Sequence, residues 1–217
     1  MFNEVIFIAS LFLAVIFTLY ARHIGLTGLV AWVSAQSILS NIFVLKQIEL
    51  FGLHVTSSEV YIVSGMFSTV LIQEQYGRRS AKKALNAAFV VLIFLGLASQ
   101  LHLAYIPSPN DITQSSYEML FGPNLRIVVA SIFAYWISQQ YNIWIFGILS
   151  KKSLNLRLSF RAFIATSTAQ ILDTFLFAMF GLYGLVFHLD QIILFSLLLK
   201  VAISVFLSQT LWFRRRA

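Results

Sequence analysis

Residues 69–100 read TVLIQEQYGRRSAKKALNAAFVVLIFLGLASQ, and this stretch decides the fold. An apolar run ends at Gln75, four basic residues follow, and a second apolar run extends from Ala84 to Tyr105. The hydrocarbon core of a bilayer is roughly 30 Å thick and takes about 20 helical residues to cross. The stretch therefore predicts two membrane-spanning helices joined by a basic connection.

Similar apolar runs fill almost all of the chain, which predicts an all-α polytopic membrane helix bundle forming a single domain over residues 1–217. The seven expected spans are Phe2–Tyr20, Leu26–Leu45, Ser58–Gln75, Ala84–Tyr105, Leu125–Leu149, Ala162–Phe187 and Gln191–Phe213. A composition of 59% hydrophobic and 11% charged residues excludes a soluble globule of this length. The chain has no cysteine, so it can form neither a disulfide nor a thiolate metal site. We expect no cofactor and no metal.

The basic residues predict an orientation in the membrane. Twelve of the fifteen lysines and arginines follow the first, third, fifth and seventh spans, and Lys46 is an outward exception. Because cytoplasmic connections are enriched in Lys and Arg, we expect the N-terminus outside and the C-terminus inside a bacterial inner membrane. The net charge of +7 then has a topological cause and does not indicate a nucleic-acid partner.

Two outward connections carry further signals. The segment from Pro107 to Pro123 is polar and contains all three prolines, which indicates either a plain solvated loop or a lid over an opening. Ser57, Ser58 and Glu59 precede the third apolar run, and we interpret them as helix-capping residues.

Ionisable side chains at membrane depth are expensive and are candidates for function. Asp173 lies near the middle of the sixth span and Lys200 near the middle of the seventh, at similar depth on adjacent helices. We expect them to form a charge pair, which either fastens the two helices or takes part in substrate or ion coupling. Glu74 lies near the cytoplasmic end of the third span, and Arg78 follows it at i+4. This spacing predicts an ion pair at the helix end.

A short pattern recurs in the fifth and sixth spans. Gln139 and Asn142 are spaced as Gln170 and Asp173 are, and each pair precedes an aromatic, an aliphatic residue and Phe. The i, i+3 spacing puts each pair on one helix face, and polar groups on facing helices form either helix contacts or a binding site. The nearby Tyr135 and Trp136 could stack on a flat heterocycle.

Several motifs resemble those of the queuosine precursor transporter family, also called the vitamin uptake transporter family. They are ILSNIFVLKQIELFGL at 38–53, EQYGRRSAKKA at 74–84, the segments 126–128 and 138–139, QILDT at 170–174, and Lys200-Val201. The resemblance covers roughly residues 26–205 and implies import of a 7-deazaguanine base for tRNA modification. It also implies a six-helix core over residues 26–217, like the substrate-binding components of energy-coupling-factor importers, behind an added helix at residues 1–25.

The resemblance also implies a binding site. Asp173 or Glu74 would accept the N–H donors of the guanine edge, while Gln139, Asn142 or Gln170 would bind its carbonyl. The remaining candidates are Asn41 in the first motif and Tyr135 or Trp136 over a ring face. The chain departs from the family at Val70 and Asn142, where members commonly carry Asp. The site could lie at mid-membrane or nearer the outer face.

Other classes fit less well. The four histidines lie near span ends without helical pairing, so the sequence does not indicate an enzyme. Uptake of another purine-like or vitamin-like heterocycle, and a membrane scaffold that transports nothing, both stay open. The same holds for a homo-oligomer and for docking to an ATP-driven energy-coupling module.

Overall fold

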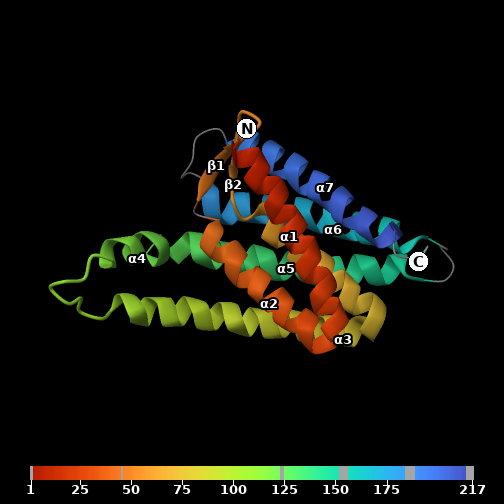
Figure 1. Ribbon diagram of the computed structural model, residues 1–217, viewed down its shortest axis with the longest axis horizontal. Coiled ribbons are helices and arrows are strands. Elements are labelled where there is room, and N and C mark those ends of the chain that lie inside the picture. The colour runs from red at the N-terminus through yellow and green to blue at the C-terminus, as the bar shows by residue number, and fades with distance from the viewer. Residues whose placement is uncertain (1, 45, 123–124, 152–155, 184–188, 214–217) are drawn as a thin grey trace.

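The computed structural model describes residues 2–44, 46–122, 125–151, 156–183 and 189–213. It confirms the helix bundle predicted from the sequence (Figure 1). Its elements are α1 (Phe2–Ile24), α2 (Leu26–Phe43), β1 (Gln47–Leu50), β2 (Leu53–Thr56), α3 (Glu59–Leu103), α4 (Gln114–Phe121), α5 (Leu125–Leu149), α6 (Leu158–Phe177), the π-helical η2 (Ala178–Leu182) and α7 (Leu189–Phe213).

The two spans expected on either side of the basic connection form two helices joined across a kink at Gly77, and the basic residues after it are helical. Together they make up the 45-residue α3, in which Gly77 alone has non-helical torsions, φ 82° and ψ 165°. A straight helix of that length would measure about 68 Å, more than twice the hydrocarbon thickness. Figure 1 shows the chain turning in α3 and running back across the molecule, so one element supplies the two expected spans.

The first half of α3 forms the centre of the bundle. Every residue from Val63 to Gln73 is buried, although a surface helix would bury only one stripe. Helices α1, α2, α5, α6 and α7 all contact α3, and Leu11 and Ala14 of α1 belong to the same hydrophobic cluster as its Val60 and Val63. The central position of this segment brings the polar side chains of four other helices toward one place.

A β-hairpin occupies the connection between α2 and α3, which the sequence did not predict. Its strands pair antiparallel, with Leu50 opposite Leu53 across a two-residue turn. Phe51 and Gly52 both have positive φ, 53° and 78°, as the turn that matches strand twist requires. Leu50 and Val55 are buried, and the hairpin packs against α7 through β2 and against α1 through β1.

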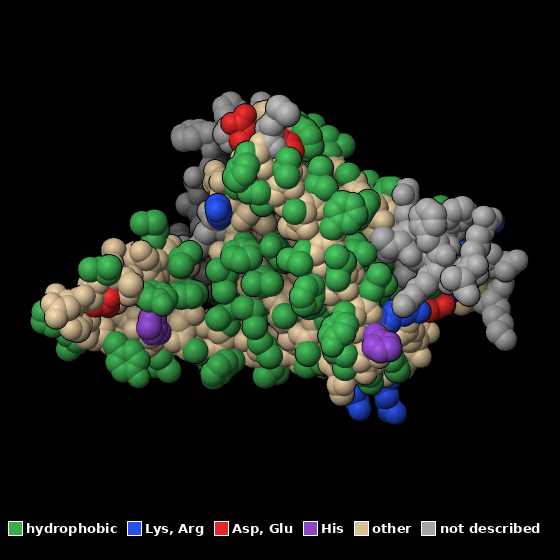
Figure 2. Space-filling view, viewed as in Figure 1, with side chains coloured by type: hydrophobic (Ala, Val, Ile, Leu, Met, Phe, Trp, Pro, Cys, Tyr) green, Lys and Arg blue, Asp and Glu red, His purple; other side chains and the backbone are tan. Residues whose placement is uncertain are grey.

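The outer surface fits a lipid environment. Among the described residues, α1, α2, α3 and the continuous segment Leu158–Gly181 are long and apolar enough to cross a membrane. Large apolar side chains such as Phe94 and Ile16 are exposed, 71% and 59%. Figure 2 shows hydrophobic side chains over the middle of the visible face. This distribution indicates a membrane protein; the inner membrane and the orientation stay predictions.

The connection between α3 and α5 contains α4, a short helix where the sequence predicted only an irregular segment. Helix α4 has no buried residue, and Figure 1 shows it at the far end of the molecule from α7. Gln100 donates a hydrogen bond to the Phe121 carbonyl, 2.9 Å, which ties the connection to α3. In the loop, the Thr113 hydroxyl and N–H both donate to Asp111 and lower the pKa of that carboxyl. This conformation does not place the connection over the bundle as a lid.

Candidate functional site

A buried polar cluster crosses the centre of the bundle and joins α2, α3, α5, α6 and α7. We call it the polar core and define it by Ser37, Glu59, Tyr135, Ser138, Gln139, Asn142, Gln170, Asp173, Thr174 and Lys200. Each of these residues is at most 6% exposed. Polar groups withdrawn from water need partners, and the contacts they make divide the polar core into a charged end and an amide end.

Lys200 is the centre of the charged end. Its Nζ lies 2.9 Å from Thr174 Oγ1, 3.3 Å from Asp173 Oδ2 and 3.6 Å from Glu59 Oε2. The structure thus places Asp173 and Lys200 together, as α6 and α7 lie side by side. A second carboxylate also contacts Lys200, and it was not part of the charge pair predicted from the sequence.

That carboxylate, Glu59, was interpreted as part of a helix cap. The structure corrects this interpretation, because Ser58, the residue that precedes α3, makes no side-chain capping bond and Glu59 is only 3% exposed. Ser196 Oγ and Thr56 Oγ1 both donate to Glu59 Oε1, at 3.0 and 3.2 Å. The hairpin that carries Thr56 is a tertiary feature, so no sequence signal distinguished this buried acid from a solvated one.

Ser138 connects the two ends. Its Oγ lies 3.1 Å from Asp173 Oδ1 and 3.0 Å from the Tyr135 carbonyl. The phenol of Tyr135 in turn lies between Ser37 Oγ, 2.7 Å, and Gln139 Nε2, 2.9 Å. Tyr135 therefore links two sets of hydrogen bonds, one from its phenol to α2 and one from its carbonyl through Ser138 to Asp173 of α6 and on to Lys200 of α7.

The amide end surrounds Met66 of α3. Asn142 Nδ2 donates to the Met66 carbonyl, 3.1 Å, and Gln170 Nε2 approaches its sulfur, 3.2 Å. Because α5 and α6 run antiparallel, Ser138 faces Asp173 while Asn142 and Gln170 meet at Met66. All four polar residues of the repeated pattern therefore belong to the polar core.

The amide oxygens at this end lack partners. Gln139 Oε1, Asn142 Oδ1 and Gln170 Oε1 are buried and accept no hydrogen bond from any described residue. The same is true of Gln36 Oε1, whose amide nitrogen bonds Ser64, and of Gln73 Oε1 further along α3. A buried acceptor without a donor costs about 1–3 kcal/mol. This arrangement suits a ligand that brings N–H groups.

Three predicted site residues lie outside the polar core. Glu74 pairs with Arg161 of α6, 3.1 Å, at the basic end of the molecule, instead of the Arg78 expected from helical spacing. Trp136 is 38% exposed and packs against Phe89. Asn41 is half-buried, one turn beyond Ser37, and is 3.5 Å from its carbonyl.

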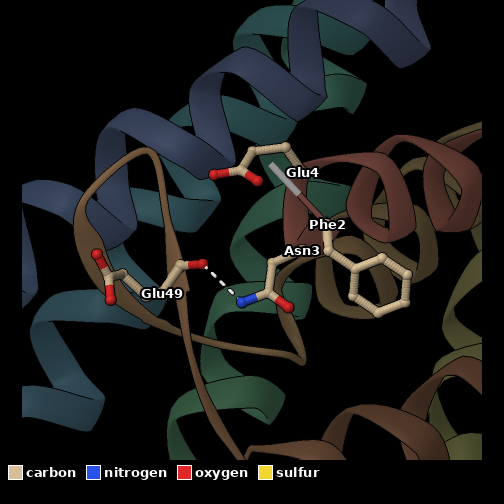
Figure 3. A pocket seen from close by; sticks show the side chains of 4 residues that line it. All are labelled: Phe2, Asn3, Glu4 and Glu49. Carbon is tan, nitrogen blue, oxygen red and sulfur yellow. Dashed lines mark hydrogen bonds between the residues drawn. The ribbon is translucent and has the colours of Figure 1, made fainter.

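A surface cavity of about 270 Å³ lies elsewhere, lined by Phe2, Asn3, Glu4 and Glu49. In Figure 3, Asn3 donates to the Glu49 carbonyl and so closes one side of the cavity where α1 meets β1. No residue of the polar core lines it.

A membrane helix bundle with a closed, charged and amide-rich centre has the architecture of a membrane transporter. The family described as "Putative vitamin uptake transporter" matches residues 56–213. A Bacillus subtilis (strain 168) protein named "Probable queuosine precursor transporter" is 30% identical over 195 residues, covering 88% of this chain and 85% of that protein. The chain belongs to this transporter family. No solved structure matches it, so the likeness to energy-coupling-factor components stays a prediction.

Proposed function

We propose that the protein imports a 7-deazaguanine base, a precursor of queuosine, and binds it at the amide end of the polar core. The observation that carries this proposal is the set of unpartnered oxygens on Gln139, Asn142 and Gln170. The guanine edge of such a base presents an N–H and an amino group side by side, and its five-membered ring carries another N–H. Donors of this kind would satisfy the acceptors that the closed bundle leaves unpaired.

Asp173 and Tyr135 support the same site. The Asp173 carboxylate is held by Ser138 on one oxygen and by Lys200 on the other, so its remaining lone pairs are available to a ligand. The Tyr135 ring lies one helical turn from Gln139 and would contact a flat base. Trp136 has no part in this proposal because its ring faces Phe89.

The function is tested in a host that cannot make queuosine and receives a precursor at low external concentration. Expression of the protein should restore modified tRNA. Hypoxanthine, which lacks the amino group of guanine, should compete with the precursor more weakly than guanine does. If well-inserted protein gives no restoration with any 7-deazaguanine base, the substrate assignment is wrong. Uptake of another heterocycle would then be the remaining alternative.

The site is tested by Gln170→Met, which keeps the side-chain volume and removes the unpartnered oxygen. Because Gln170 donates only to a sulfur, the variant should fold at least as well as the native protein. Loss of one hydrogen bond to the ligand of about 1.4–3 kcal/mol should raise the half-saturating concentration of uptake at least about ten-fold. The control is Gln73→Met, a buried amide two turns away from Met66. Its Nε2 donates to the Ile143 carbonyl, 3.0 Å, so this variant should lose stability but should leave that concentration unchanged.

A comparison of the two variants distinguishes a binding site from amides that only pack helices together. If Gln170→Met raises the half-saturating concentration no more than Gln73→Met does, the amides serve only helix packing and the site proposal fails.

A further inference from the structure

The charged end of the polar core carries an excess negative charge. Glu59 and Asp173 face a single ammonium, Lys200, within 3.6 Å. When all three groups are ionised the net charge is −1, and each residue is at most 6% exposed. An unbalanced charge in a low-dielectric interior is costly, so a cation from solution would stabilise this cluster.

The geometry selects the kind of cation. A metal ion such as calcium takes six or more oxygen ligands, and the described residues hold no group of three acidic, His or Cys side chains that could bind one. Lys200 already occupies the space between the two carboxylates. A proton needs only a single oxygen atom with a free lone pair.

Glu59 Oε2 is such an atom. Oε1 accepts both hydroxyls, from Ser196 and Thr56, whereas Oε2 is buried and accepts no hydrogen bond from a described residue. Its ion-pair contact with Lys200, at 3.6 Å, is the longest that Nζ makes. Thr56 is half-buried in the hairpin, so Glu59 is one hydrogen bond away from the molecular surface.

We propose that Glu59, Asp173 and Lys200 form a proton-binding site that couples substrate import to proton entry. This inference rests on the proposed function. A proton arriving from the hairpin side forms an O–H bond at Glu59 Oε2, and Lys200 then pairs with Asp173 alone. The cluster becomes neutral, and no other group changes its charge. The same O–H bond breaks when the proton leaves on the cytoplasmic side.

The described groups that face Glu59 are consistent with this exchange. Lys200 and Ser196 come from α7, Asp173 from α6 and Thr56 from β2. Thr174 accepts from Lys200 in addition to Asp173 and holds the ammonium on the α6 side after Glu59 becomes neutral. Protonation of Glu59 therefore requires no large movement of Lys200.

The test uses the full chain in proteoliposomes and the labelled 7-deazaguanine base that restores tRNA modification in the assay above. With one proton per substrate molecule, an inward gradient of about one pH unit should drive up to about ten-fold accumulation, since each decade of concentration equals one pH unit. A protonophore should abolish this accumulation. Glu59→Gln should still exchange internal for external base but should accumulate none. Glu49→Gln, an exposed carboxylate of the same hairpin, should accumulate base as the native protein does.

Accumulation by Glu59→Gln at the native level would overturn the proposal. So would accumulation by the native protein that does not depend on the pH gradient. If Glu59→Gln does not insert into the membrane, the coupling is tested on the native protein instead. In a weakly buffered detergent solution, addition of the base should then change the number of bound protons. No change anywhere between about pH 6 and 8 would overturn the coupling. Absence of exchange by the native protein would count against the proposed function itself, so the two failures are distinguishable.

Discussion

At the scale of single residues, Lys200 has the largest effect on folding that we expect in this chain. It is 4% exposed and stands between two carboxylates and a hydroxyl. Removal of a buried ion's partner leaves an uncompensated charge, which is more harmful than replacing the whole group by apolar residues. The order of variant stabilities therefore reports which of the three residues interact.

We predict that Lys200→Met lowers the free energy of unfolding by about 3–5 kcal/mol, because two buried carboxylates then face each other. Asp173→Asn should cost less, since Glu59 still pairs with Lys200. Lys200→Met with Asp173→Asn should recover stability only in part, and the triple variant that adds Glu59→Gln should recover most of it. Thermal unfolding in detergent measures all four.

Lys82→Met is the control, since Lys82 is exposed and its removal should change stability by no more than about 0.5 kcal/mol. Native stability of Lys200→Met would contradict the buried triad. Full recovery in the double variant would mean that Glu59 does not share the ammonium.

At the scale of elements, the bend of α3 depends on Gly77. With φ 82° and ψ 165°, it adopts torsions that residues with a Cβ avoid. No neighbouring atom lies within 4 Å of a Cβ added there, so a substitution would suffer from backbone strain alone. This position allows one helical element to supply two spans.

We predict that Gly77→Ala destabilises the protein by about 1–3 kcal/mol, the usual cost of a side chain in this backbone region. Gly96→Ala in the second half of α3 is the matched control. It also has open space around the added Cβ but helical torsions, so it should stabilise by about 0.5–1 kcal/mol. Thermal unfolding of the two variants side by side measures the difference, and equal stability would mean that the bend does not need glycine.

At the scale of the whole molecule, basic and acidic residues separate to opposite ends. Arg78, Arg79, Lys82 and Lys83 are exposed at the bend of α3, whereas Glu49 and Asp111 are exposed on the hairpin and on the connection that carries α4. The positive-inside rule predicts that the bend lies in the cytoplasm. In this predicted orientation, a proton would reach Glu59 from outside.

The predicted orientation can be tested by cysteine labelling, because the chain has no natural cysteine. A cysteine at Ser80, next to the bend, should react with a membrane-impermeant thiol reagent only from the cytoplasmic side. A cysteine at the exposed Ser115 of α4 should react only from outside. Labelling in intact cells and in inverted vesicles compares the two. Reaction of Ser115→Cys from the cytoplasm would overturn the topology.

The sequence alone determined the features that depend on the summed hydropathy and charge of neighbouring residues. Apolar length predicted helices at each expected span, and the alternation of charge predicted two chemically different ends. Helix order also placed Asp173 and Lys200 at similar depth on adjacent spans, and their charged atoms lie 3.3 Å apart in the structure. These inferences succeed because transfer free energy and helical rise are properties of the local chain.

Only the tertiary structure decided which side chains share the polar core. Tyr135 points inward and Trp136, the next residue, points to Phe89, because the rotation of α5 about its axis is set by packing against α3 and α6. Glu59 is buried against Thr56 of β2 and Ser196 of α7, while Glu74 on the same helix pairs with Arg161 at the basic end. Such contacts join residues far apart in the chain, and local hydropathy contains no information about them.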